Sequence, residues 1–155
     1  HMVSDGLDAG DSIITRWYKL LKNWGEGIHD GVKSTAGECC GDSNITGTSA
    51  WTTDAAEGSG TDRSATSETD GVHPDSLKFV DPPTVGFYKL WLTPATVVSW
   101  RTTNYGIVWR ATLYTNDLDD RIYISSAEYT NQPSFTCYYT VGGGSTGSKV
   151  MIKKQ

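Results

Sequence analysis

Hydrophobic and polar residues alternate with a period of two along several short stretches of the chain. Residues 12–24 show the pattern clearly, with Ile13 and Trp17 on one side and Ile14 and Tyr18 on the other. Successive side chains of a β-strand point to opposite faces, so this pattern predicts strands. We expect strands at residues 12–24, 76–80, 85–92, 106–114, 121–126, 134–141 and 149–153.

One short helix is predicted between the apolar stretch 85–92 and the strand that starts at residue 106. Thr93 is a favourable N-cap residue, and Pro94 suits the first helical position because its missing N–H would have no partner there. We expect the helix to end near Asn104 and to bury Val97, Val98 and Trp100. Abundant Gly, Thr, Ser, Trp and Tyr also favour strands and turns, and short strands separated by turn signals predict a β-sandwich.

The segment 33–75 lacks such a pattern and is strongly acidic. Its only large apolar residues are Ile45, Trp51 and Val72, and it carries eight acidic residues against Lys33 and Arg63. So few apolar groups cannot bury a long regular element, which predicts a long ordered loop or a set of very short strands. A loop of this length is normally functional, or else is held in place by a disulfide or a metal. The net charge of −5 and the lack of a basic stripe exclude nucleic acid as a partner.

Calcium is the metal that this loop could bind, because Ca²⁺ takes carboxylate and carbonyl oxygens from irregular backbone. Oxygen-bearing side chains alternate from Asp42 to Thr46 and are followed by Gly47, but the twelfth position is Thr53 where a calcium loop has Glu. The alternative is that these carboxylates face water. The predicted ligands are Asp42, Asn44, Asp54 and Asp62.

Three cysteines, Cys39, Cys40 and Cys137, permit one disulfide and one free thiol. A bridge from Cys137 to Cys39 or Cys40 would tie the loop to the sheet. The two adjacent cysteines could bridge each other instead, and three reduced thiols are the remaining alternative.

The length of 155 residues fits one domain. We expect residues 1–11 to be a tag remnant with a flexible N-terminus, residues 12–141 to form the sandwich, and residues 142–155 to be a Gly/Ser linker with a terminal strand. No apolar run is long enough for a signal peptide or membrane span, so membrane insertion is not expected. Nucleophile elbows, phosphate loops and zinc-ligand spacings are also missing from the sequence, so we expect no enzymatic activity.

The alternation also predicts a binding surface on the outer face of the sheet. Planar sugar faces stack on aromatic rings, and arginines bind carboxylates. The alternative is that these residues only cover the solvent side of a sheet. The predicted ligand-binding residues are Arg110, Tyr114, Arg121, Tyr123 and Tyr138.

Several short motifs follow one another along the chain: Trp24-Gly25-Glu26-Gly27, the acidic insert with Trp51 and Asp62, Val98-Ser99-Trp100, Asn104-Tyr105-Gly106 and residues 124–139. Their order resembles the DNRLRE family of secreted β-sandwich domains. Glu128 and Pro133 fit the family pattern, whereas Ala127 stands where the family usually has arginine. The resemblance implies a jelly-roll-like antiparallel sandwich, a secreted or cell-surface location, and non-catalytic polysaccharide binding in some members.

Two functions follow from these expectations. The first is an extracellular carbohydrate-binding module for an acidic or plant/algal-type polysaccharide, and the second is a structural or adhesive domain that joins neighbouring domains or subunits by β-strand addition. Family domains usually carry further strands before the matching segment, so an edge would need cover. We expect residues 148–153 to add a strand to the sandwich, preferably within their own chain.

Overall fold

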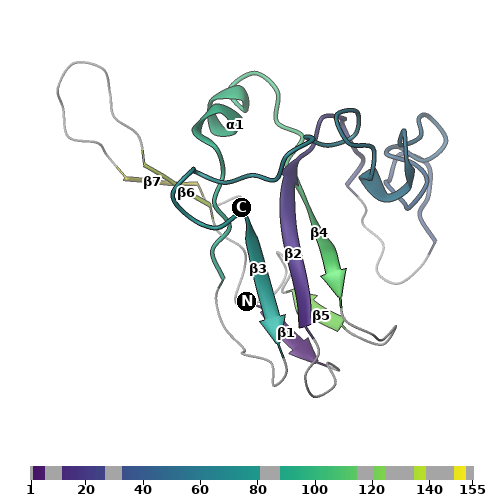
Figure 1. Cartoon of the computed structure of the whole chain (residues 1–155). Helices are drawn as coiled ribbons and strands as arrows, with labels where there is room; N and C mark the ends of the chain where they lie inside the picture. The colour runs from purple at the N-terminus through teal and green to yellow at the C-terminus, as the bar shows by residue number, and fades with distance from the viewer. Residues whose placement is uncertain are drawn as a thin grey trace.

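The computed structural model describes residues 2–5, 12–26, 33–80, 88–114, 121–124, 135–138 and 149–152, with side chains in 12–26, 33–80 and 88–111. These residues are rich in strands and contain one short α-helix (Figure 1). In chain order the elements are β1 (Met2–Asp5), β2 (Ser12–Lys19), the 3-10 helix η1 (Asp54–Ala56), β3 (Ser76–Val80), α1 (Pro94–Ser99), β4 (Ile107–Tyr114), β5 (Arg121–Ile124), β6 (Phe135–Tyr138) and β7 (Lys149–Ile152).

Strand β2 is the centre of an antiparallel three-stranded sheet with the order β3-β2-β4. One face of β2 is buried at Ile13, Thr15 and Trp17, as the alternation predicts. On this face Ile13 and Phe79 form a hydrophobic core with Leu77, Tyr88 and Trp109 packed against it. The Trp17 side chain is fully buried, and its Nε1 donates to the carbonyl oxygen of Trp91 at 2.6 Å. The segment that follows residue 88 therefore covers this face.

The loop 33–75 packs at the end of the sheet where β2 ends and β4 begins (Figure 1). There Leu20, Trp51 and Ala56 form a second buried cluster, with Tyr105 and Val108 against it. Apart from η1 and a few isolated bridges, the loop has no regular element, as predicted. Few apolar residues are enough to anchor the loop, because Trp51 and Ala56 pack against Leu20 at the end of the sheet.

Helix α1 begins as predicted but ends early. The Thr96 N–H donates to Thr93 Oγ1 at 3.2 Å, and Pro94 occupies the first turn. The helix ends at Ser99, because turn-like bonds such as Arg101 N–H to the Val98 carbonyl replace the helical pattern. Val98 is 63% exposed, so the prediction that it is buried was wrong.

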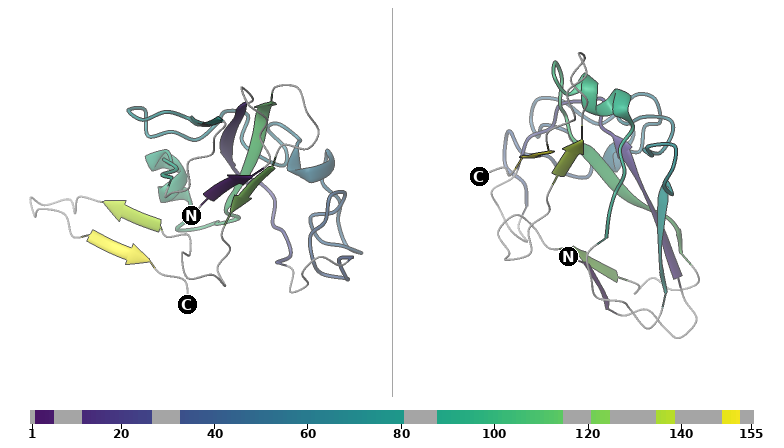
Figure 2. Two further views of the ribbon diagram at one scale, coloured as in Figure 1. Left: turned by 90° about the horizontal axis from the view of Figure 1, so that it is seen from below. Right: turned by 90° about the vertical axis from the view of Figure 1, so that its left-hand side faces the viewer.

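The predicted sandwich would consist of two sheets packed face to face. The strands in the described part of the chain instead belong to three separate sheets (Figure 2). A mostly-β chain with an antiparallel sheet and one short helix is confirmed, whereas the jelly-roll sandwich stays a prediction. Residues 88–92 form no strand, contrary to expectation, and residues 85–87 lie outside the described residues. No helix among the described residues has the length and apolar character to cross a bilayer.

Both ends of the described chain form strands. β1 pairs antiparallel with β5, so the prediction of a flexible N-terminus was wrong for Met2–Asp5. β7 pairs antiparallel with β6, with Val150 opposite Cys137. The tail thus forms a strand within its own chain, but its partner is β6 in a separate two-stranded sheet, and the addition of this strand to a sandwich stays a prediction.

Candidate functional site

The face of the three-stranded sheet opposite the Ile13–Phe79 core gathers basic side chains. Arg16 lies opposite Arg110 on β4, and Ile14 lies opposite Lys78 on β3. Directly opposed residues of an antiparallel pair share one face, so both arginines and the lysine belong to the same surface. This surface, which we call the basic face, comprises Arg16, Lys78 and Arg110 together with Arg63, which covers Tyr18.

Arg63 reaches the basic face from the acidic loop. Its guanidinium carbon lies 4.2 Å from the centre of the Tyr18 ring, which is two residues from Arg16 on the same side of β2. Arg63 Nη1 donates to the carbonyl oxygen of Ser64 at 3.1 Å, whereas its Nε is buried without a hydrogen-bond partner. Stacking on the ring therefore orients a guanidinium that has few polar contacts of its own.

Two exposed carboxylates partly neutralise this surface. Arg16 Nε lies 3.4 Å from Asp75 Oδ2, and Arg110 Nη2 pairs with Glu57 Oε1. The carboxyl side chains are 41% and 49% exposed, so water weakens both pairs. The Ser67 hydroxyl lowers the pKa of Asp75, burial opposes this, and Arg16 lowers the pKa further. Among the described residues, basic side chains therefore outnumber the carboxylates paired with them on this face, although Arg63 itself is buried and the net charge of the chain is −5.

Of the residues predicted to bind a ligand, Arg110 belongs to the basic face. The β2–β4 register shifts between Ile14 and Thr15, so the alternation from Arg110 does not continue unbroken to Tyr114, which lies opposite Ile13. The backbones of Tyr114, Arg121, Tyr123 and Tyr138 belong to strands, but their side chains lie outside the described residues. Arg16 and Lys78 were not among the predicted binding residues. The alternation in 12–24 and 76–80 does place each of them next to a core residue, and so on the opposite face of the sheet.

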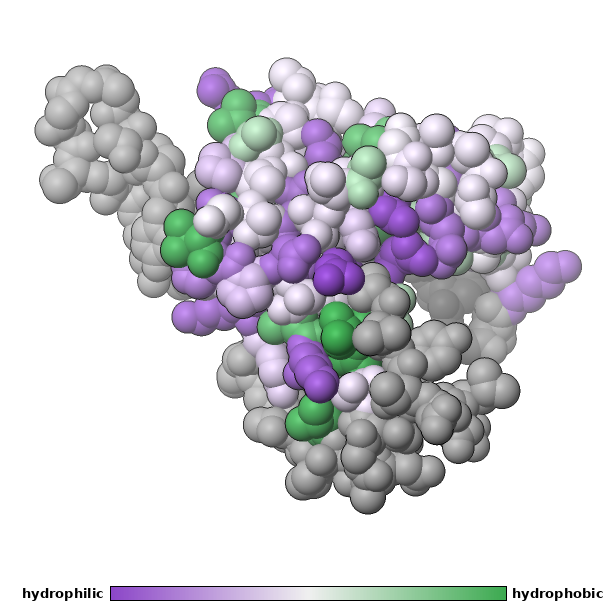
Figure 3. Space-filling model, in the orientation of Figure 1, coloured by the Kyte–Doolittle hydropathy of each residue, from purple (hydrophilic) through white to green (hydrophobic). Residues whose placement is uncertain are grey.

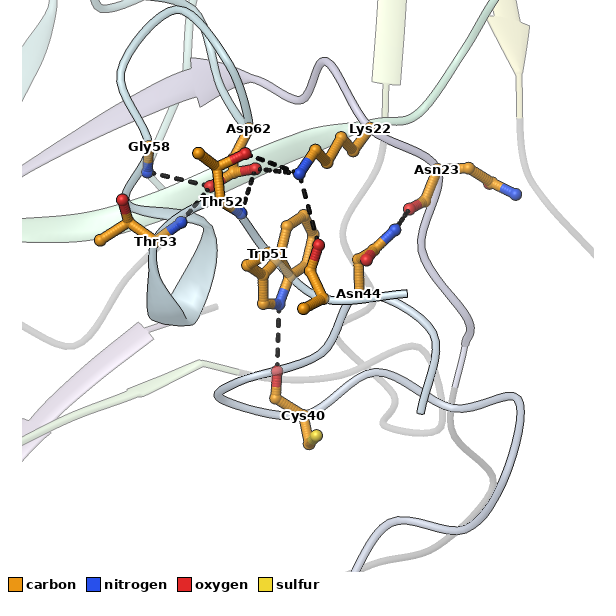
Figure 4. Close-up of polar contacts among 10 residues, drawn as sticks. Lys22, Asn23, Cys40, Asn44, Trp51, Thr52, Thr53, Gly58 and Asp62 are labelled. Atoms are coloured by element: carbon orange, nitrogen blue, oxygen red, sulfur yellow. Dashed lines mark hydrogen bonds and ion pairs between the residues drawn. The ribbon is translucent and has the colours of Figure 1, made fainter. Parts of the chain in front are cut away.

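Among the predicted calcium ligands, Asp62 lies at the centre of the acidic loop, where its side chain is fully buried (Figure 4). The carboxylate accepts N–H groups from Thr52 at 2.8 Å, Thr53 at 2.9 Å and Gly58 at 3.1 Å. Lys22 Nζ completes the set, 2.8 Å from Asp62 Oδ1. A carboxylate offers about four acceptor positions, and these four donors use them.

The Lys22 ammonium serves as the cation of this loop. Besides Asp62 it donates to Thr52 Oγ1 at 2.7 Å and to the Ala50 carbonyl oxygen at 3.3 Å, so three oxygens surround it (Figure 4). Burial by itself raises the pKa of Asp62, but Lys22 and the N–H groups of Thr52 and Thr53 outweigh it and lower the pKa far below its usual range. The side chain is therefore ionised at every physiological pH.

The other predicted metal ligands have separate roles. Asp42 Oδ1 accepts from the Cys40 thiol at 2.8 Å, and Asp54 is an exposed residue at the start of η1. Asn44 is buried: its Nδ2 donates to the Asn23 carbonyl oxygen at 2.8 Å, and its Oδ1 has no hydrogen-bond partner. In the described ranges no three His, Cys, Asp or Glu side chains gather in a way that could hold a metal ion. The four predicted ligands thus do not form one site.

Cys39 and Cys40 are free thiols, so the predicted disulfide to Cys137 or between the two neighbours is not formed in the structure. Hydrogen bonds hold this part of the loop in its place. The Cys39 N–H donates to the Gly25 carbonyl oxygen at 2.8 Å, and Trp51 Nε1 donates to the Cys40 carbonyl oxygen at 3.1 Å.

A second buried carboxylate joins the loop to the helix. Glu68 is 4% exposed, and its Oε2 accepts from the Thr93 N–H at 3.1 Å and the Thr93 hydroxyl at 2.9 Å. Its own N–H donates to the Trp17 carbonyl oxygen at 2.9 Å. Glu68 thereby ties the N-cap of α1 to the central strand.

No family profile, no curated protein and no solved structure matches the chain, and the resemblance to the DNRLRE family stays a prediction.

Proposed function

We propose that this chain is a non-catalytic, extracellular carbohydrate-binding module whose basic face binds an acidic polysaccharide. The observation that carries the proposal is the register that sets Arg16 opposite Arg110 beside Lys78, on a chain that is otherwise acidic. Planar guanidinium groups match carboxylate and sulfate oxygens with paired hydrogen bonds. A repeating anionic polymer lying along the strands would meet several such groups in succession.

The carboxylates on this face favour an exchangeable ligand over a permanent internal network. Exposed ion pairs contribute only about 0–1 kcal/mol each. An acidic sugar can therefore displace Asp75 or Glu57 at small cost.

The rival function is an adhesive domain that joins copies by β-strand addition. In the described sheet β3 and β4 are the outer strands, which is the observation that favours it. On the face seen in Figure 3, however, hydrophobic side chains lie in separate small groups within a mainly polar surface. Such a surface suits a hydrated ligand better than a large apolar contact.

Affinity gel electrophoresis tests the proposal with polygalacturonate as the acidic polymer and hydroxyethyl cellulose as the neutral one. We expect retardation by polygalacturonate that weakens as salt is added. The double variant R16A/R110A should lose it, whereas R101A, which removes an exposed arginine after α1, should retain it. Equal melting temperatures would show that the variants are folded. Failure of an acidic and neutral panel to retard the protein would refute the proposal, and concentration-dependent dimers would then favour adhesion.

A further inference from the structure

Trp24 is a partly exposed tryptophan whose ring is held in one orientation. Its side chain lies at the end of the sheet, 37% of its residue surface is exposed, and its Nε1 donates to the Tyr105 carbonyl oxygen at 2.8 Å. The hydrogen bond satisfies the indole N–H, and the exposed third of the residue surface is open to a ligand.

The backbone on both sides of Trp24 is fixed by the acidic loop. Asn44 Nδ2 donates to the Asn23 carbonyl oxygen at 2.8 Å, and the Gly25 N–H donates to the Asn44 carbonyl oxygen at 2.9 Å (Figure 4 shows the first of these). Gly25 lies so close to Gly37 that a Cβ would overlap its carbonyl oxygen. Contacts before and after Trp24 thus fix its position, and a ligand would pay little to order it.

Two asparagine side chains with unused amide donors belong to the segments that hold the Trp24 ring. Asn23 precedes Trp24, and Asn104 precedes the Tyr105 that holds the indole; both are exposed. Asn104 Oδ1 accepts the Gly106 N–H at 2.9 Å, which fixes its amide and leaves its NH₂ group unpaired within the described part of the chain. The Asn23 side-chain amide likewise makes no hydrogen bond to another described residue, and it points away from the loop in Figure 4.

We infer that Trp24, with Asn23 and Asn104, is a second sugar subsite that takes the face of a pyranose ring. One face of such a ring presents C–H groups that stack on an indole, while its hydroxyls project sideways to hydrogen-bonding amides. The subsite recognises ring shape and hydroxyls, so it binds neutral and acidic sugars alike. This inference rests on the proposed function in taking a polysaccharide as ligand, but it uses none of the residues of the basic face.

Calorimetric titration with hexagalacturonate and with cellohexaose tests the subsite in the full chain. W24L keeps an apolar side chain without a stacking face, and we expect it to lower the affinity for a bound oligosaccharide about tenfold or more. W24F loses the bond to Tyr105 but keeps a ring, so it should stay within about threefold of wild type. L21A is the matched control, because Leu21 is 38% exposed on the same stretch, and its affinity should be unchanged.

A second measurement observes sugar binding in the wild-type protein and uses a variant only to assign the signal. In ¹⁵N-labelled wild type, the indole N–H signal of Trp24, assigned by its loss in W24F, should shift on titration. Wild-type affinity in W24L together with an unmoved indole signal would overturn the subsite. If the affinity in the same titrations still depended on Arg16 and Arg110, the proposed function would stand. Trp24-dependent binding of cellohexaose without binding of hexagalacturonate would support the subsite and refute the acidic ligand. Binding of neither sugar would overturn both.

Discussion

The buried carboxylate of Asp62 should be the strongest single determinant of stability in the acidic loop. Replacing it by alanine removes the acceptor of the Thr52, Thr53 and Gly58 N–H groups and the partner of Lys22. Asp62 is 0% exposed and its bond to the Gly58 N–H is buried, so that N–H loses its partner where water has little access. We therefore expect D62A to loosen the segment that covers the end of the sheet.

The contacts set the size of the effect. A buried donor left without a partner costs about 1–3 kcal/mol, and removal of one member of a buried ion pair costs about 3–5 kcal/mol. Lys22 is 31% exposed and can regain water, which offsets part of the second cost. We expect the free energy of unfolding to fall by about 3–5 kcal/mol, which is a large share of the roughly 5–15 kcal/mol that stabilises a typical domain.

Urea unfolding followed by tryptophan fluorescence measures this loss. D54A is the matched control, because Asp54 is an exposed carboxylate of the same loop whose side chain caps no N–H of η1. We expect D54A to stay within about 0.5 kcal/mol of wild type. If D62A also lost less than about 1 kcal/mol with an unchanged m-value, the hydrogen bonds drawn in Figure 4 would not carry the stability assigned to them.

The same carboxylate predicts how stability depends on pH. The pKa of Asp62 is lowered in the folded state, so its stabilisation is fully present above the unfolded value of about 3.9 and is lost as the pH falls toward the folded value. The His73 N–H lowers the pKa of Asp70 most, burial opposes it, and the His73 ring and the Val72 N–H help bring it to about 2. Wild-type stability should therefore fall from about pH 5 downward. The fall should be smaller in D62A, and equal slopes in the two proteins would contradict this.

Two further predictions concern the residues that fix the loop. G25A should lower the melting temperature by several degrees, because its methyl group would overlap the Gly37 carbonyl, whereas G41A, with open space at its Cβ, should not; equal melting temperatures would contradict the packing. Iodoacetamide should alkylate Cys40 before Cys39. Asp42 raises the pKa of the Cys40 thiol, but hydrogen bonds to neighbouring hydroxyl groups lower it by more, whereas burial raises the pKa of Cys39. Peptide mapping that finds the reverse order would refute this.

The regular elements were the most predictable part of the fold. Alternation located β2, β3 and β4 because each has one side against a core, and Thr93-Pro94 fixed the start of α1. The end of α1 was missed because Val98 has the spacing of a buried residue but faces solvent. β1 was missed because Met2–Asp5 has no alternation of its own, and it forms a strand only through pairing with β5.

The candidate site was less predictable, because cross-strand neighbours depend on register. Alternation marks Arg16, Lys78 and Arg110 as non-core positions, but only the pairing of the strands shows that they meet on one face. The shift between Ile14 and Thr15 breaks the pattern that grouped Arg110 with Tyr114. Neither feature can be derived from the spacing of residues within a single strand.

The sequence predicted that a disulfide or a metal could hold the acidic loop. In the structure Cys39 and Cys40 are free thiols, and the Lys22 ammonium, whose long side chain reaches into the loop from just after β2, binds Asp62. Calcium binding stays a prediction. The link between Lys22 and Asp62 also positions the proposed binding surface, because Arg63 follows Asp62 directly and lies over Tyr18. The acidic loop thus contributes Arg63 to the basic face as well as the two carboxylates, Glu57 and Asp75, that pair with Arg110 and Arg16.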